Sequence, residues 1–98
     1  MVVHIVMIKL KDEFNNQETK KEVKSKIESL LGVIPSLKSM EVGINFADEE
    51  RAMDISLIAT FNDKEGLREY AVDKYHQEVI EFIKKVASYT KVVDYEKV

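Results

Sequence analysis

Two segments in the middle of the chain, residues 37–46 and 52–61, alternate apolar and polar side chains around a short polar turn at residues 47–51. This pattern predicts an antiparallel β-hairpin with one apolar face and one mixed polar face. The apolar face is expected to carry Met40, Val42, Ile44, Phe46, Met53, Ile55, Leu57, Ala59 and Phe61. Because an apolar sheet face must be covered by another layer, this hairpin constrains the fold strongly.

Strands are also predicted at both ends of the sequence. Residues 2–9 form an apolar, β-branched run, and residues 91–96 form a last short strand. One face of the first strand carries His4, Val6 and Ile8, and the other carries Val3, Ile5 and Met7. A strand that is apolar on both faces is normally covered on both faces, so we expect a layer on each side of this sheet.

The two segments between the strands predict helices. Asn15 or Asn16 can cap the first helix, and Gly32 and Pro35 suit its end. Its apolar face is expected to be Val23, Ile27, Leu30, Leu31 and Ile34.

Asn62 or Asp63 can cap the second helix, whose inner face begins with Leu67, Tyr70 and Ala71. The apolar pattern is interrupted at residues 72–75, where we expect a kink or break. It restarts with His76, Val79, Ile80, Ile83, Val86 and Ala87.

The resulting order, β-α-β-β-α-β, is that of α+β ferredoxin-like folds. We predict one domain over residues 1–98, with a four-stranded antiparallel sheet and two helices on one face. The other face would be bare and would include apolar residues of the first strand and Ile58. Such a patch usually marks an interface, so we expect a homodimer in which two sheets face each other and close a dimeric α/β barrel.

The composition excludes several classes of function. The net charge of −3 argues against nucleic acid as a partner, and the lack of cysteine excludes disulfides and thiol chemistry. The apolar run at the start is too short for a secretion signal, and no stretch approaches the roughly 20 apolar residues of a membrane span. We therefore expect a soluble cytoplasmic protein that has no membrane partner.

The two histidines, His4 and His76, are the candidate site residues together with Tyr70. If the fold brings them together, they offer acid/base chemistry near neutral pH. The structural alternative is that Tyr70 and His76 make a hydrogen bond that pins a broken helix onto the sheet, and that His4 is a satisfied, half-buried histidine on a strand. No paired motif such as His-x-x-x-His indicates a metal, and no Gly-x-Gly loop or serine nucleophile elbow is present. We expect no cofactor and no metal.

Five motifs, in order along the whole chain, are similar to one known family. The segment His4-Ile-Val-Met-Ile-Lys-Leu-Lys resembles the opening His-x-Val-x-(Phe/Ile)-Lys of the stress-responsive α/β-barrel domain (Dabb) family. The later motifs are Ile34-Pro35-x-Leu37-x-x-Met40-x-x-Gly43, Asp54-Ile55-x-Leu57 with Phe61, Leu67-x-x-Tyr70-x-x-x-x-x-His76, and Val93-Asp94-Tyr95. The resemblance implies a ferredoxin-like protomer, a homodimer closed through its sheets, and a cleft between helices and sheet.

The resemblance implies less about the reaction, because most members of the family have none assigned. In a few members, including a plant polyketide cyclase, a tyrosine and a histidine with the Tyr-x5-His spacing act as orienting and acid/base groups. Tyr70 and His76 match these two positions, and His4 matches a strand histidine of the same cleft. The family usually reads Tyr-x-x-His-Pro-x-His, whereas this chain has Asp73 and Lys74 in place of the first histidine and the proline. We hypothesise that Asp73 approaches His76 and raises its pKa.

Three functions therefore stay open. The first is binding of a small apolar or carbonyl-bearing ligand between helices and sheet. The second is a cofactor-free cyclase, isomerase or lyase that uses Tyr70, His76 and His4, and the third is a purely structural, self-assembling barrel. Polar side chains of the hairpin are expected to line a polar barrel interior or a wet dimer interface: Glu41, Asn45, Asp54, Ser56 and Thr60.

Overall fold

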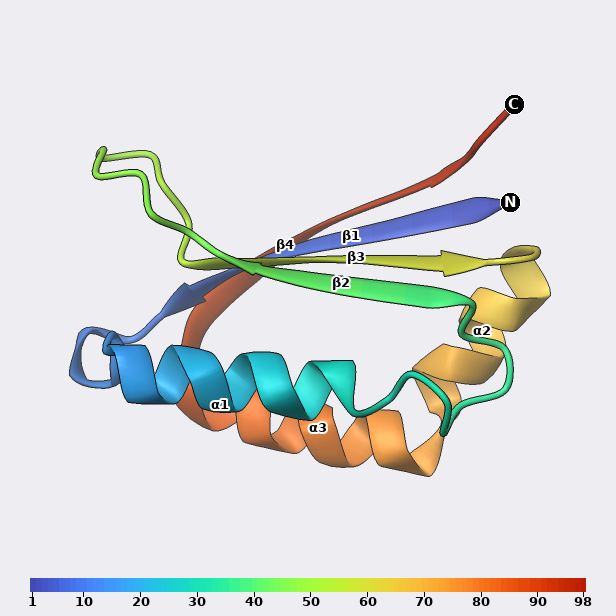
Figure 1. Cartoon of the computed structure of the whole chain (residues 1–98), viewed down its shortest axis with the longest axis horizontal. Coiled ribbons are helices and arrows are strands. Elements are labelled where there is room, and N and C mark those ends of the chain that lie inside the picture. The colour runs from blue at the N-terminus through green and yellow to red at the C-terminus, as the bar shows by residue number, and fades with distance from the viewer.

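The computed structural model describes residues 1–98 and contains one four-stranded antiparallel sheet with the strand order β2-β3-β1-β4. The elements are β1 (Val2–Leu10), a short 3-10 helix η1 (Asp12–Phe14), α1 (Gln17–Glu28), β2 (Ser39–Ile44), β3 (Ile55–Phe61), α2 (Lys64–Val72), α3 (Lys74–Val86) and β4 (Ala87–Glu96). Figure 1 shows the sheet above the helices. The predicted ferredoxin-like order is confirmed, with the second helix divided into α2 and α3.

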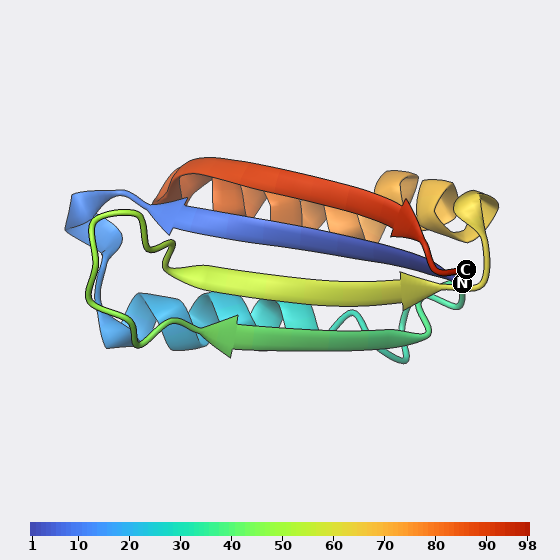
Figure 2. The same cartoon turned by 90° about the horizontal axis from the view of Figure 1, so that it is seen from above.

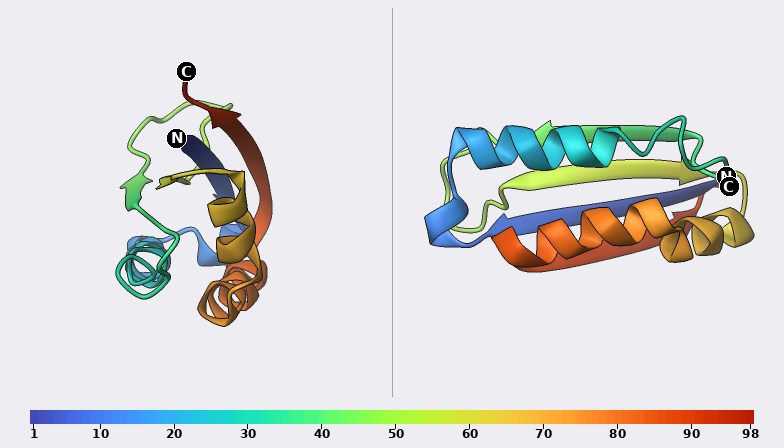
Figure 3. Two further views of the ribbon diagram at one scale, coloured as in Figure 1. Left: turned by 90° about the vertical axis from the view of Figure 1, so that its right-hand side faces the viewer. Right: turned by 90° about the horizontal axis from the view of Figure 1, so that it is seen from below.

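The helices form a layer on one face of the sheet. Helices α1 and α3 run side by side along that face, and α2 lies at one end (Figures 1 and 3). The opposite face carries no element of this chain, and both termini lie at the same end of the sheet (Figure 2). The expected bare sheet face is therefore present.

Side-chain caps set the starts of the helices. The Asn16 side chain accepts a hydrogen bond from the Thr19 amide at 2.8 Å, and Asp63 accepts one from the Gly66 amide at 2.8 Å. Asp73 ends α2 and caps α3 by accepting from the Tyr75 amide, also at 2.8 Å. The predicted break at residues 72–75 is thus produced by a new N-cap, which turns the chain and starts a separate helix.

The first helix is shorter than its apolar pattern suggests. Helix α1 ends at Glu28, and residues 29–34 form turns in which Gly32 adopts a φ of +90°. Leu30 and Ile34 are buried there, but Leu31 is 45% exposed. The prediction that Leu31 belongs to the buried helix face was wrong, because a turn does not keep the helical periodicity on which it depended.

The hairpin strands are also shorter than predicted. Asn45 accepts a hydrogen bond from the Ala47 amide and donates one to the Ala47 carbonyl, which closes a local turn directly after β2. The chain therefore leaves the strand before Phe46, which is 99% exposed and not part of the apolar face. By contrast, β4 begins at Ala87, four residues earlier than the predicted residue 91.

The core lies between the helices and the sheet. Its innermost side chains come from β1, β3 and α1, and they include Ile8, Val23, Ile27 and Phe61, each at most 1% exposed. The edge strand β4 contributes little to it, since nearly all of its residues are exposed. The sheet is thus covered on one face only within a single chain.

Candidate functional site

The fold brings the three predicted site residues together. His4 lies in the central strand β1, Tyr70 in the last turn of α2 and His76 in the first turn of α3. The Tyr70 ring lies between the two imidazoles, with centroid distances of 6.2 Å to His4 and 4.2 Å to His76. The break between α2 and α3 matters here, because it turns Tyr70 and His76 toward the same point above the sheet.

These three rings lie at the wall of a cavity between the helices and the sheet. The cavity has a volume of about 210 Å³ and is mostly apolar. We call it the inner cavity, and it is lined by His4, Val6, Ile8, Ile27, Leu30, Leu57, Tyr70, His76, Val79, Ile80, Ile83, Thr90 and Val92. A small number of polar groups in an apolar enclosure is typical of sites for small molecules.

A carboxylate holds His4 from the neighbouring strand. His4 and Asp94 are register partners in β1 and β4, and the His4 Nδ1 donates a hydrogen bond to the Asp94 carboxylate. The contact also forms an ion pair when the imidazole is charged. Because Nδ1 carries the proton in this contact, neutral His4 has its Nε2 free as an acceptor.

Asp94 was not among the predicted site residues and appeared only in the closing motif. The β1–β4 register, which the sequence does not specify, places it opposite His4. The alternation of β4 residues was the one signal that could have suggested its orientation.

Tyr70 is the buried donor of the site. Its side chain is 3% exposed and packs on Phe61 with a centroid distance of 5.1 Å. Burial raises the pKa of Tyr70 to about 12, so the phenol keeps its proton at neutral pH. A protonated phenol beside the inner cavity can donate a hydrogen bond to a carbonyl oxygen.

His76 is the candidate base. Its pKa is lowered mainly by burial, while its hydrogen bond to the Ala71 carbonyl raises it, nearby His4 lowers it and Asp73 raises it. The His76 Nδ1 donates to the Ala71 carbonyl at 3.2 Å. Neutral His76 therefore has its Nε2 unprotonated and available to accept a proton.

The hypothesis about Asp73 is corrected by this geometry. Asp73 does favour the charged imidazolium, but it is the smallest of the four influences, and the net pKa shift of His76 is downward. The Asp73 carboxylate is bound to the Tyr75 amide as a helix cap. Asp73 thus shapes the site through the backbone more than through charge.

One of the polar hairpin residues lies elsewhere than expected. Asp54 is only 7% exposed, accepts a hydrogen bond from the Leu10 amide at 2.7 Å and lies 3.8 Å from the Lys9 ammonium. It therefore joins β1 to the hairpin and does not line an open interface. Glu41, Ser56 and Thr60 do lie on the bare face, opposite Ile58, Met7 and Val3 in the strand register. Asn45 lies in the turn after β2.

Two classes of feature are not found. No group of three or more histidine, cysteine, aspartate or glutamate side chains is arranged to hold a metal ion. None of the helices is long and apolar enough to cross a membrane.

Comparisons with known proteins agree with the architecture. The sequence profile described as Stress responsive A/B Barrel Domain matches residues 2–97. A dimeric protein of unknown function with a ferredoxin-like fold, from Bacteroides fragilis, is 30% identical, with a TM-score of 0.84 over 98% of this chain and 95% of that chain. No curated protein matches the sequence.

Two more distant structures share the fold. An Arabidopsis thaliana protein is 22% identical, with a TM-score of 0.88 over 100% of this chain and 96% of that chain. The hydroxynitrile lyase of Passiflora edulis is 18% identical, with a TM-score of 0.83 over 96% of this chain and 90% of that chain. The same architecture thus occurs both in an enzyme and in proteins without an assigned reaction.

Proposed function

The chain belongs to the stress responsive A/B barrel domain family, and we propose that it forms a homodimer that binds a small apolar, carbonyl-bearing ligand between helices and sheet. The observation that carries this proposal is the inner cavity, where Tyr70, His76 and His4 meet at an apolar enclosure. A filled core would leave no such space, so the cavity counts against the purely structural alternative.

The chemistry of the three groups favours a carbonyl oxygen as the recognised atom. Tyr70 supplies a protonated hydroxyl in a setting of low polarity, where a hydrogen bond to a ligand is stronger than in water. The rest of the lining offers mainly aliphatic contacts, which suit an apolar remainder.

A second candidate function is cofactor-free proton transfer on such a ligand, as in a cyclase, isomerase or lyase. In this reaction the His76 Nε2 would take a proton from the carbon next to the carbonyl, and the Tyr70 hydroxyl would stabilise the enolate oxygen that forms. The lowered pKa of His76 favours this alternative, because it keeps the base unprotonated at neutral pH. His4, fixed by Asp94, would orient the ligand from the sheet side.

The dimer would form through the bare sheet face. Ile5, Ile58 and Val93 lie in one row across β3, β1 and β4, and Ile58 and Val93 are 38% and 54% exposed. Exposed Met7 and Tyr95 extend this apolar patch. An exposed apolar sheet face is typical of an interface, and the Bacteroides fragilis structure is described as dimeric.

We place the protein in the cytoplasm as part of the same proposal. The lack of cysteine fits a reducing compartment. Fractionation of cells that express the tagged chain tests this placement, and recovery outside the cytoplasmic fraction would contradict it.

Native mass spectrometry of freshly purified protein tests the binding site. We expect a dimer that carries a reproducible small-molecule adduct, and we expect Tyr70→Phe to lose it because the donor hydroxyl is gone. Tyr95→Phe is the matched control, since it removes a hydroxyl from the bare sheet face and should keep the adduct. An adduct that persists in Tyr70→Phe and His76→Ala would contradict the assignment of the site.

A further inference from the structure

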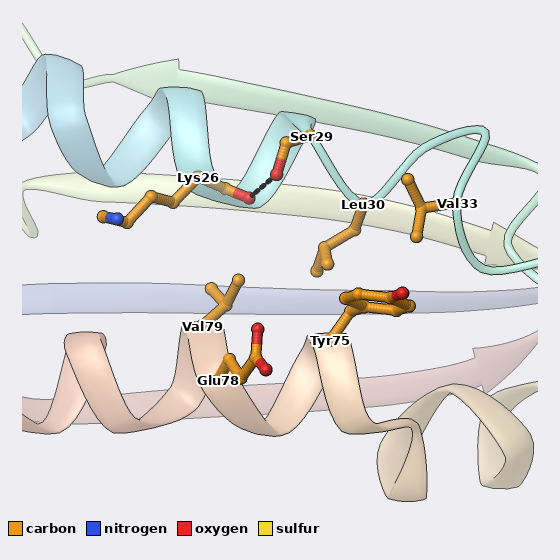
Figure 4. Close-up of a pocket in the computed structure, with 7 residues that line it drawn as sticks. All are labelled: Lys26, Ser29, Leu30, Val33, Tyr75, Glu78 and Val79. Carbon is orange, nitrogen blue, oxygen red and sulfur yellow. Dashed lines mark hydrogen bonds between the residues drawn. The ribbon is translucent and has the colours of Figure 1, made fainter.

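The helix layer contains a second space directly outside the inner cavity. A groove of about 420 Å³ lies between α1 and α3, and we call it the outer groove. In Figure 4, Leu30 and Val33 line it on the α1 side, and Tyr75 and Val79 line it on the α3 side. Leu30 and Val79 also line the inner cavity. The two spaces therefore share these two lining side chains.

Their sizes indicate that the inner cavity alone is small for a ligand site. Its volume of about 210 Å³ lies below the roughly 300–1,000 Å³ that is usual for such sites. The inner cavity extended by the outer groove lies within that range. A ligand larger than a small fragment that reaches Tyr70 and His76 can continue past Leu30 and Val79, the two side chains that line both spaces.

The outer groove suits an apolar chain. Val33 is 48% exposed and Tyr75 is 43% exposed, although both are large and apolar. A bound chain would cover both side chains. Four of the seven lining residues are apolar, and the charged ones, Lys26 on α1 and Glu78 on α3, come from opposite sides of the groove (Figure 4).

We propose that the inner cavity and the outer groove form one site for an elongated ligand, with a carbonyl group beside Tyr70 and His76 and a straight apolar chain in the outer groove. Leu30 and Val79 form the passage between the two parts and determine which chains can pass. This inference rests on the proposed function and adds the shape and class of the ligand.

Titration of the purified dimer with methyl ketones of increasing chain length, starting from butanone, tests the proposal. The imidazole NMR signals of His4 and His76 report on binding, and they are easily resolved because the chain has no other histidine. Each methylene group that leaves water should lower Kd by about fourfold, as its transfer free energy implies. We expect this gain to continue for chains that are too long for the inner cavity.

Val33→Trp should fill the outer groove and leave the inner cavity unchanged. The variant should bind butanone like the wild type but gain nothing from longer chains. Leu31→Trp is the matched control, because Leu31 is similarly exposed, at 45%, and does not line the groove. Val79→Ala should widen the passage and also enlarge the inner cavity, so its effect is measured as the ratio of long-ketone to butanone affinity, which should rise.

The possible failures are distinguishable. If butanone shifts the His76 signals but longer chains bring no gain in the wild type, or if Val33→Trp keeps that gain, the elongated site is wrong and the proposed function stands. If no ketone of any length shifts the signals of His76 or His4, the proposed function itself is wrong.

Discussion

A lysine on the bare sheet face should separate the proposed dimer. Ile58 lies in the middle of that face, opposite Ile5 in the register, and 38% of it is exposed in the single chain. Complete burial of an isoleucine side chain contributes about 1.5–3 kcal/mol. Burial of the exposed part of Ile58 against the partner subunit would therefore contribute about 1 kcal/mol. Removal of this apolar contact alone would weaken the dimer only modestly.

The charge introduced by Ile58→Lys has a larger effect. Removing an ammonium group from water costs several kcal/mol, and twofold symmetry places the substitution on both sides of the interface. At about 3 kcal/mol for each lysine, the dimer would lose about 6 kcal/mol, and its Kd would rise about 10⁴-fold. If the flexible lysines reach water and halve this cost, a rise of about 100-fold remains.

Sedimentation velocity over a range of concentrations measures this change, with circular dichroism as the test of folding. The matched control is Val72→Lys, which adds the same charge at a position of α2 that is 78% exposed and away from the sheet. We expect monomer for Ile58→Lys and dimer for Val72→Lys. A folded Ile58→Lys protein that dimerises like the wild type would refute the assignment of this face.

Three further predictions concern His76, Asp94 and Gly32. The folded state lowers the pKa of His76. The stabilisation that neutral His76 gives the fold is therefore complete above the pKa of about 6.5 that histidine has in the unfolded chain, and it is lost as the pH falls toward the folded-state pKa. Urea denaturation over this pH range should show less pH dependence in His76→Gln than in the wild type, and equal dependence would contradict the shift. Asp94→Asn should leave neutral His4 as a mixture of tautomers, seen in the ring ¹⁵N shifts, and an unchanged Nδ1–H tautomer would disprove the positioning role. Gly32→Ala should lower the unfolding free energy by about 1–2 kcal/mol, because φ is +90° there, and an unchanged urea midpoint would refute this.

Much of the fold follows from local patterns in the sequence. The alternation of β3 and the break at residues 72–75 are encoded by neighbouring residues, so each was predictable, and the caps Asn16 and Asp63 were each one of two adjacent candidates. The exposure of Phe46 and the early end of α1 were not, because they depend on which turn closes first. Asn45 and Gly32 decide those turns, and their effect on flanking apolar residues is not visible in the periodicity.

The candidate site was predictable in part for a similar reason. The Tyr70 and His76 spacing places both residues near one helix break, and His4 was a candidate as the second histidine of the chain. Asp94 and the inner cavity arise from long-range features, namely the β1–β4 register and the packing of α1 against α3. The burial that governs the pKa of His76 also comes from tertiary packing. The sequence therefore suggested that Asp73 raises this pKa, but not that the effect of Asp73 is smaller than that of burial.

Imidazole NMR of the wild-type dimer with butanone reports directly on ligand binding at the inner cavity. We expect saturable shifts of the His76 and His4 signals that are lost in Tyr70→Phe and kept in Tyr95→Phe. Signals that stay unchanged at high concentrations of butanone and of longer ketones, in a folded protein, would contradict binding at this site.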